Sequence, residues 1–248
     1  MNQVPPSLPS ALARIRVVLS RTSHPGNIGS AARAMKTMGL TRLVLVNPRD
    51  FPSAGADALA SGATDVLAGA RVTATVGEAL EGTVLAIGMT ARRRDLSHEM
   101  VSMREAAPRA VAETAAGEVA LVFGNEMSGL SNAELDHCQM AAMIPANPDY
   151  SSLNLAAAVQ VACYELALAA QAWTADRGEA REPATHEEIE HLHAHFEEAM
   201  ILSGFLDPQQ PKRLMTRMRR LFARTRLEKE EVNILRGMLA AFTDRWKR

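Results

Sequence analysis

The sequence is poor in the features that mark secreted and membrane proteins. Its 248 residues include only two cysteines, Cys138 and Cys163, and no CxxC pair, so we expect two reduced core thiols rather than a disulfide. Residues 1–20 lack the basic start and long apolar core of a signal peptide. No run of about 18 apolar residues is free of polar side chains, so no membrane span is expected. These absences predict a cytoplasmic protein with no membrane partner.

The common nucleotide-binding fingerprints are absent as well. No GxGxxG follows a predicted strand and no GxxxxGK[ST] occurs, so neither a dinucleotide fold nor a P-loop is indicated. The formal net charge of −1 gives no sign of a nucleic-acid partner in the total. His191, His193 and His195 alternate on one predicted helix, but only the outer two share a face. With no third ligand beside them, we expect no metal site.

Near-continuous apolar runs indicate strands that are buried on both faces. They cover residues 15–20, 42–47, 83–90 and 118–125, and shorter candidates lie at 72–76 and 140–145. Helices are expected at 28–38, 102–116 and 131–137, where Ser131 and Glu134 have the spacing of a capping box. Buried strands that alternate with helices predict an α/β fold, with a mostly parallel sheet covered by helices on both faces.

The composition changes twice after these strands. The stretch "LNLAAAVQVACYELALAAQAW" (153–173) is almost wholly apolar, which predicts a helix buried on most sides, in a homodimer seam or in the core of one chain. Residues 174–188 are polar and contain Gly178 and Pro183, which indicates a linker. Amphipathic helices are predicted at 186–204, 211–227 and 229–248. We therefore expect a catalytic or binding domain at 1–173, a linker at 174–188 and a small helical extension at 189–248.

Cationic residues gather in two places. Between Lys212 and Arg226 there are seven basic residues and no acid, and four of the arginines share one helical face. These four are Arg213, Arg217, Arg220 and Arg224. They either pair with the acidic helix before them or contact RNA phosphates. A second group follows a predicted strand end, where open α/β sheets bind ligands. Its members are Arg92, Arg93 and Arg94, and we expect both groups to bind RNA.

Three glycine-containing polar junctions follow predicted strands, at residues 23–29, 124–129 and 147–154. Asn27 either caps the next helix or converges with Arg33 on an anion above its N-terminus. The hydroxyls and amide of "SSLN" (151–154) either cap a helix or line a site. Glu126 has no evident structural duty. Because the carboxyl ends of parallel strands meet at one edge of a sheet, we expect the three junctions to form one ligand crevice.

These junctions resemble, in order and spacing, the three motifs of the SpoU branch of the SPOUT RNA methyltransferases. They are "HPGNIGSAARAMKTMGL", "LVFGNEMSGLS" and "MIPANPDYSSLNLAAAVQVACYEL", and the resemblance extends to the tail segment "LFARTRLEKEEVNILRGMLA". It is closest to the bacterial tRNA 2′-O-methyltransferases of that branch. The resemblance implies a C-terminal trefoil knot, a homodimer, S-adenosylmethionine as methyl donor without a metal, and tRNA as substrate. The implied target is a cytidine or uridine at position 32 of the anticodon loop.

Matched motif by motif, the resemblance also implies roles for individual residues. The catalytic residues would be Asn27, Arg33, Glu126, Ser152 and Asn154. The methyl donor would contact Thr90, Ala91, Gly124, Asn125, Glu126, Ile144, Ser152 and Leu153. Asn125 departs from relatives that carry a basic residue there. Arg33 acts either as a general base or as a cation that orients the ribose. The alternatives are an rRNA 2′-O-methyltransferase and an RNA-binding protein on the same fold without catalysis.

Overall fold

A seven-stranded sheet forms the centre of the computed structural model, which describes residues 11–91, 99–172 and 182–246. All pairs of named strands are parallel, and the strand order is β3-β2-β1-β6-β4-β7-β5. The strands are β1 (Ile15–Ser20), β2 (Arg42–Val46), β3 (Arg71–Thr73), β4 (Thr83–Met89), β5 (Met100–Ser102), β6 (Glu118–Phe123) and β7 (Met140–Met143). The predicted α/β fold with a parallel sheet is confirmed.

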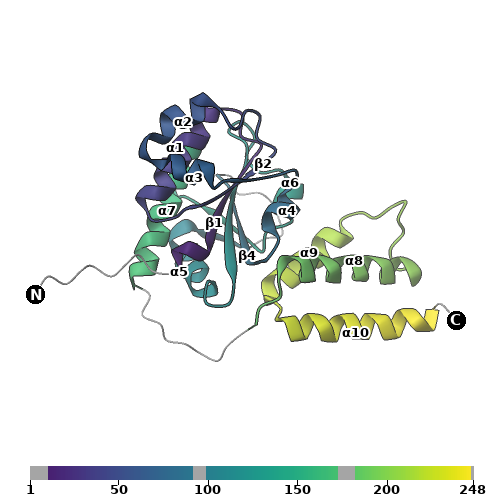
Figure 1. Cartoon of the computed structure of the whole chain (residues 1–248). Coiled ribbons are helices and arrows are strands. Elements are labelled where there is room, and N and C mark those ends of the chain that lie inside the picture. Colours follow the sequence, from purple (N-terminus) through teal and green to yellow (C-terminus); the bar gives the residue numbers. More distant parts are fainter. Residues whose placement is uncertain (1–10, 92–98, 173–181, 247–248) are drawn as a thin grey trace, which may run out of the picture.

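The helices alternate with these strands and then continue alone to the C-terminus (Figure 1). The α-helices are α1 (Pro25–Thr37), α2 (Ala54–Ala60), α3 (Thr64–Ala68), α4 (Val76–Leu80), α5 (Met103–Glu113), α6 (Asn132–Leu135), α7 (Leu155–Ala172), α8 (His186–Leu202), α9 (Leu214–Thr225) and α10 (Lys229–Trp246). Two 3-10 turns are η1 (Leu12–Arg14) and η2 (Ser61–Ala63). The predictions missed α2, α3, α4 and β5. Each is seven residues or shorter, so none is long enough to show a clear periodicity.

The sheet is buried on both faces because its strands alternate between two apolar clusters. In β1, Ile15, Val17 and Leu19 pack with α1, α5 and α7, whereas Val18 packs on the opposite side with α4. Figure 1 shows α1, α5 and α7 on the first face and α4 and α6 on the second. The prediction of helices on both faces is therefore confirmed. Cys138 and Cys163 are buried and free, as expected.

The strand β7 lies inside the sheet, although it is the last strand in the sequence. Gly88 of β4 pairs with Ala141, and Val101 of β5 pairs with Ala142. The strand β7 therefore lies between β4 and β5, both of which precede it in the sequence. From β7 the chain runs through a loop into α7, which packs against α1 and α5. This insertion fixes the loops after β4, β6 and β7 at one edge of the sheet.

The sequence predicts α7 either in a homodimer seam or in the core of one chain, and neither alternative alone describes its burial. Val159, Cys163 and Leu166 are fully buried in the core of the chain. Tyr164 and Leu168, on another side of the helix, remain 47% and 41% exposed. The helix thus serves the core of its own chain and also leaves apolar side chains uncovered. No helix in the described ranges is long and apolar enough to cross a membrane.

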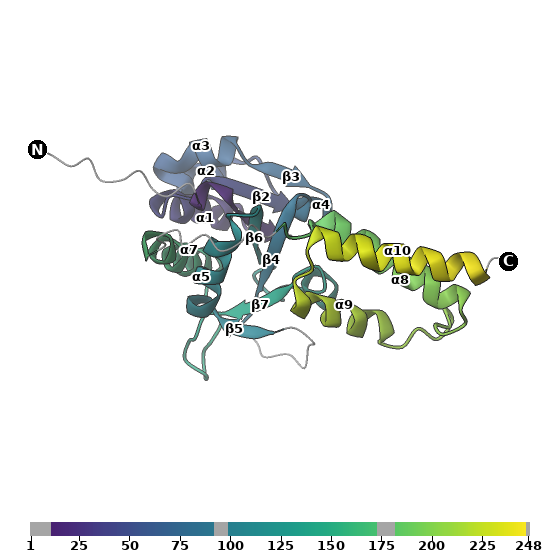
Figure 2. The same cartoon turned by 90° about the horizontal axis from the view of Figure 1, so that it is seen from below.

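The helices α8, α9 and α10 form a separate C-terminal domain with its own apolar cluster. Leu192, Val232 and Leu239 are buried within it. Among its contacts with the amino edge of the sheet, the Gly82 N–H donates to Glu187 Oε1 at 2.7 Å, and Arg226 Nη1 donates to Glu113 Oε1 at 2.6 Å. Figure 2 shows this domain beside β4, β7 and α4.

Candidate functional site

The loop after β1 leads into α1, and the side-chain amide of Asn27 does not cap this helix. Pro25 opens α1 with His24 as the N-cap residue, because the fixed φ of proline suits the first helical position. Asn27 therefore lies in the first turn, and the expectation that it caps the helix is wrong. Its side chain is free to point elsewhere, and Asn27 Nδ2 donates to Glu126 Oε1 at 2.9 Å.

Glu126, in the loop after β6, gathers the start of α1 around its carboxylate. Ser23 donates twice to Oε2, from its backbone N–H at 3.0 Å and its hydroxyl at 2.9 Å, and the His24 N–H donates to Oε1 at 3.2 Å. Burial alone would raise the pKa of Glu126, but the hydrogen bonds from Ser23 and Asn27 outweigh it and lower the pKa from 4.5 to about 2. Such a carboxylate is a poor proton acceptor at neutral pH. Its hydrogen bonds join the loop after β6 to the start of α1.

The third junction joins the same network through Asn154. Its Nδ2 donates to Asn27 Oδ1 at 3.0 Å, while its Oδ1 accepts the N–H groups of Ala156 at 2.9 Å and Ala157 at 3.3 Å. One amide therefore both caps the first turn of α7 and links it to α1. Hydrogen bonds connect Glu126, Asn27 and Asn154 in series, so three segments distant in sequence meet at one point.

A pocket of about 340 Å³ opens beside this network, at the carboxyl ends of β4, β6 and β7. All eight residues expected to contact the methyl donor line it: Thr90, Ala91, Gly124, Asn125, Glu126, Ile144, Ser152 and Leu153. The predictions missed other lining residues in the same loops, including Met89, Phe123, Met127, Asp149 and Tyr150. Their position next to the predicted residues in the sequence is the feature by which they could have been predicted.

The bend after β6 requires a glycine. A Cβ on Gly124 would lie 2.1 Å from the backbone carbon of Gly129 and from the Leu130 nitrogen. The Gly129 N–H donates to the Asn125 carbonyl at 2.8 Å, which closes the loop, and Asn125 Nδ2 ties it to the Arg21 carbonyl at 2.7 Å. The backbone therefore folds back on itself and forms one wall of the pocket.

The pocket has apolar walls and an uncovered rim. Phe123, Ile144 and Leu155 line it, while Met127 and Tyr150 at its rim are 89% and 81% exposed. Large apolar side chains with that exposure mark a surface that another molecule covers. Loop backbone, hydroxyl groups and apolar walls together suit a small ligand with both a flat apolar part and hydrogen-bonding groups.

Arg33 lies apart from the pocket of its own chain. It is exposed on α1 and is not among the residues that line the pocket. Ser152 lines the pocket and is itself exposed. Four of the five expected catalytic residues are therefore at the pocket or in its hydrogen-bond network, and the fifth, Arg33, is not.

The two predicted cationic groups have different outcomes. Arg92, Arg93 and Arg94 lie outside the described residues. On α9 all four predicted arginines are exposed: Arg213, Arg217, Arg220 and Arg224. The acidic partners of this helix lie on its other face, where Arg219 pairs with Glu190 of α8. Pairing and an exposed cationic face therefore coexist on one helix.

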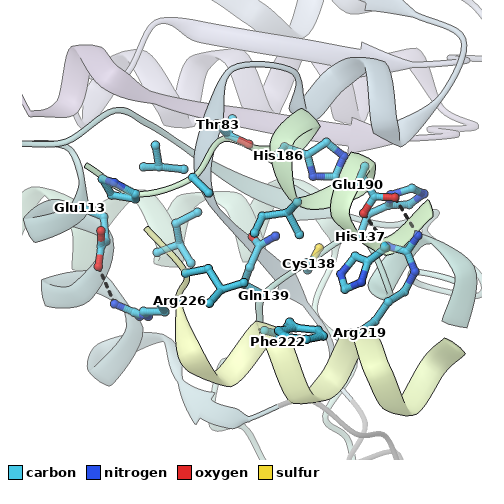
Figure 3. Close-up of a pocket in the computed structure, with 18 of the residues that line it drawn as sticks. Thr83, Glu113, His137, Cys138, Gln139, His186, Glu190, Arg219, Phe222 and Arg226 are labelled. Carbon is cyan, nitrogen blue, oxygen red and sulfur yellow. Dashed lines mark hydrogen bonds and ion pairs between the residues drawn. The ribbon is translucent and has the colours of Figure 1, made fainter. Parts of the chain in front are cut away.

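A second group of ionisable side chains lies at the amino edge of the sheet. His137, His186 and Glu190 approach one another there, in a small cavity between β4, β7 and the helices α8 and α9 (Figure 3). The histidines that stand out in the sequence are instead His191, His193 and His195. Of these, His193 is buried and lines this cavity. The sequence gives no local signal for the group, because His137 lies far from the two α8 residues along the chain.

Comparison with known families identifies the class. The model of the SpoU rRNA Methylase family matches residues 14–164. This range contains the whole sheet and the pocket, so the fold and the site define a SpoU-type methylase. Among solved structures, a probable methylase family protein from Haemophilus influenzae Rd KW20 is 44% identical, with a TM-score of 0.63 over 94% of this chain and 97% of that one.

The C-terminal domain identifies the member of that class. The model for the tRNA methyltransferase TrmJ C-terminal domain matches residues 187–248. The tRNA (cytidine/uridine/adenosine-2′-O-)-methyltransferase TrmJ of Pseudomonas aeruginosa (strain UCBPP-PA14) is 50% identical over 242 residues, 92% of this chain and 93% of that one. The crystal structure of TrmJ from Z. mobilis ZM4 is 32% identical, with a TM-score of 0.83 over 93% of this chain and all of that one. The chain belongs to the TrmJ family of tRNA 2′-O-methyltransferases and is an enzyme.

Proposed function

We propose that the protein transfers a methyl group from S-adenosylmethionine to the ribose 2′-hydroxyl of a cytidine or uridine at position 32 of the tRNA anticodon loop. The observation that carries the proposal is the pocket after β4, β6 and β7, which is lined by all eight residues expected to contact the donor. The named activity of the 50% identical Pseudomonas relative supports tRNA over rRNA as the substrate. A tRNA substrate in turn implies a cytoplasmic location.

The residues present fit the methyl donor. The pocket of about 340 Å³ offers apolar walls at Phe123 and Ile144 for the adenine. The backbone wall at Gly124, where a Cβ has no room, allows close approach to a ligand. When bound, S-adenosylmethionine supplies an electrophilic methyl group. The insertion of β7 between β4 and β5 supports a trefoil knot around this pocket.

The chain must also prepare the 2′-hydroxyl, which is a weak nucleophile until it loses its proton. We assign this to Arg33, acting as a cation that orients the ribose and stabilises the developing alkoxide. A guanidinium is protonated in proteins, and Arg33 is exposed to water on α1, which favours this role over that of a general base. Asn27, Glu126 and Asn154 hold the loops in place through their hydrogen bonds.

A homodimer accounts for the position of Arg33. The uncovered side chains Tyr164 and Leu168 on α7 offer an apolar seam, and α7 packs beside α1. In a symmetric dimer that includes this face, Arg33 of one copy approaches the pocket of the other. The exposed rim residues Met127 and Tyr150 then become covered on assembly.

The tRNA body would bind the exposed arginine face of α9. Its members are Arg213, Arg217, Arg220 and Arg224. Their helical spacing presents a row of cations to a phosphate backbone, and the binding should weaken steeply with salt. The predicted group Arg92, Arg93 and Arg94 would add contacts near the pocket, because it follows β4 in the sequence.

The proposal is tested by supplying labelled S-adenosylmethionine to the purified chain with total tRNA or with rRNA, followed by nucleoside mapping. We expect label in 2′-O-methylcytidine and 2′-O-methyluridine from position 32 of tRNA. Label in rRNA alone would support the alternative substrate. Binding of tRNA without any methyl transfer would contradict the proposed reaction.

A further inference from the structure

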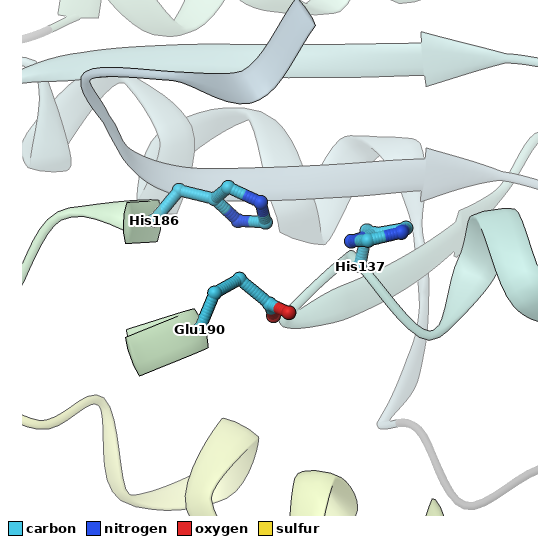
Figure 4. Close-up of side chains that lie close together, drawn as sticks. All are labelled: His137, His186 and Glu190. Carbon is cyan, nitrogen blue, oxygen red and sulfur yellow. The ribbon is translucent and has the colours of Figure 1, made fainter. Parts of the chain in front are cut away.

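Three side chains that could hold a metal ion meet where the C-terminal domain contacts the sheet. His137 comes from the segment between α6 and β7, and His186 and Glu190 lie one turn apart on α8. One candidate ligand atom from each lies within 4.8 Å of the others. Figure 4 shows the two imidazole rings and the carboxylate turned toward a common point.

The two histidines have unsatisfied nitrogens. His186 is only 4% exposed, and the Nδ1 atoms of both His137 and His186 are buried without a hydrogen-bond partner. Buried polar atoms are nearly always paired, so an unpaired atom in a native protein needs an explanation. The Nδ1 of His193, which lines the same cavity of about 40 Å³, is a third such atom, and a cation bound by His137 and His186 would give partners to two of the three.

The donor set selects the kind of cation. Two imidazole nitrogens and one carboxylate oxygen are typical zinc ligands, whereas magnesium and calcium prefer oxygen alone. Zinc–ligand bonds of about 2.0–2.2 Å place tetrahedral ligands roughly 3.3 Å apart. The present separations of up to 4.8 Å must therefore shrink by about 1.5 Å, by movement of the two imidazole rings toward the carboxylate that Arg219 holds. A water molecule would complete the fourth position.

The ion pair between Glu190 and Arg219 is compatible with such a site. Arg219 Nη1 donates to Glu190 Oε1 at 2.5 Å, and Nη2 donates to Oε2 at 2.7 Å. Each carboxylate oxygen keeps a further lone pair for a metal, and carboxylates that bind metals are commonly hydrogen-bonded from outside. Arg219 would hold Glu190 in the orientation that the metal needs.

We propose that His137, His186 and Glu190 form a zinc site that fastens the C-terminal domain to the amino edge of the sheet. The cavity is lined by Thr83 and Gln139 at the amino ends of β4 and β7, whereas the methyl-donor pocket lies at the carboxyl ends. The zinc would therefore lie away from the site of methyl transfer, and it would fix how the arginine face of α9 is presented beside the catalytic domain.

The site is tested on the full-length chain without a polyhistidine tag. Metal-free protein is dialysed against zinc, and bound zinc is measured for wild type, His137→Ala, His186→Ala and the control His191→Ala. His191 and His195 lie one turn apart on α8, so the control also tests weak surface binding. We expect stoichiometric zinc in wild type and in His191→Ala, and at least a tenfold loss of zinc affinity in the other two variants.

Thermal unfolding supplies a second readout. Zinc at 100-fold above its Kd should raise the Tm of wild type by about 5–10 °C, and it should leave the Tm of His137→Ala unchanged. If the alanine variant does not fold, His137→Gln takes its place. Cobalt(II) added to wild type should give the visible absorption of a four-coordinate nitrogen and oxygen site.

Three results would overturn the proposal. The first is wild type that retains no zinc and gives no cobalt spectrum. The second is loss of zinc in His191→Ala with retention in His137→Ala, which would place the metal on His191 and His195. Equal zinc affinity in all four proteins would place the metal elsewhere.

Discussion

The carboxyl edge and the amino edge of the sheet present different kinds of chemical group. At the carboxyl edge, the pocket is formed by bent backbone and by amide and hydroxyl side chains, and its carboxylate Glu126 is held by Ser23, His24 and Asn27. At the amino edge, histidine, glutamate and arginine side chains meet, and the Nδ1 atoms of His137, His186 and His193 are buried without a hydrogen-bond partner. The carboxyl edge thus holds its side chains in a connected hydrogen-bond network. The amino edge leaves imidazole nitrogens unpaired where the C-terminal domain contacts the sheet. Ligand binding and domain attachment are thereby kept apart on opposite edges.

The largest expected effect comes from a residue that belongs to neither edge. Arg33→Ala and Arg33→Lys should each lower the rate of methyl transfer by about 10²–10³-fold, because alanine removes the cation and lysine lacks the planar fork of the guanidinium. Calorimetry should show that S-adenosylmethionine binds both variants as it binds wild type, since Arg33 does not line the pocket. Full activity in the lysine variant would refute the role of the guanidinium.

A mixture of two inactive variants tests whether Arg33 acts on the pocket of the other chain in a dimer. If Arg33 acts across a dimer seam, Arg33→Ala and Gly124→Val are inactive alone, but co-refolded chains form heterodimers with one intact site. About a quarter of the wild-type activity should then return in an equal mixture. Size-exclusion chromatography verifies that dimers form. No recovery in a mixture that contains heterodimers would confine Arg33 to its own chain.

The next effect concerns the rigidity of the carboxyl edge. Glu126→Gln should lower the free energy of unfolding by about 2 kcal/mol at pH 7, because a charged acceptor of several hydrogen bonds is lost. The folded-state pKa of Glu126 is lowered to about 2, so its contribution is complete above pH 4.5 and is lost as the pH falls toward 2. Urea unfolding at several pH values measures the difference. In the exposed control Glu81→Gln, the difference should be small.

A smaller effect is expected from the C-terminal domain. The double variant Arg217→Gln/Arg220→Gln should weaken tRNA binding by about tenfold and reduce the slope of log K against log salt by about 1 for each lost phosphate contact. Binding of the methyl donor should not change. The control Arg71→Gln removes an exposed arginine at the β3 edge of the sheet. An equal loss of affinity in the control would remove the assignment of α9.

The smallest effect should come from the contact between the two domains. Arg226→Ala breaks the ion pair with Glu113, whose side chains are 31% and 18% exposed. Partly exposed ion pairs contribute little, so we expect a loss of about 0.5–1 kcal/mol in unfolding free energy and unchanged donor binding. Thermal unfolding of wild type, Arg226→Ala and Lys229→Ala tests this. A large loss in Arg226→Ala would make this pair, rather than the histidine cluster, the main attachment.

The sequence predicts the carboxyl edge far better than the amino edge. The strands are apolar runs, and the glycine, asparagine or serine residues that follow their carboxyl ends indicate a bend there. The amino-edge cluster has no such pattern, because His137 and the α8 residues come together only through the docking of two domains. Asn27 shows a limit of local reasoning as well. Pro25 starts the helix earlier than the asparagine suggested, so the amide that was expected to cap α1 instead binds Glu126.

The central claim is that the bent backbone at the carboxyl edge holds the methyl donor. Calorimetric titration of S-adenosylmethionine into wild type, Gly124→Val and Gly62→Ala tests it most directly. The added side chain at Gly124 would collide with backbone at 2.1 Å, whereas a Cβ at Gly62 meets nothing within 4 Å. We predict one donor site per chain in wild type and in Gly62→Ala, and a loss of affinity of about 10²-fold or more in Gly124→Val. Equal affinity in a correctly folded Gly124→Val would contradict the account.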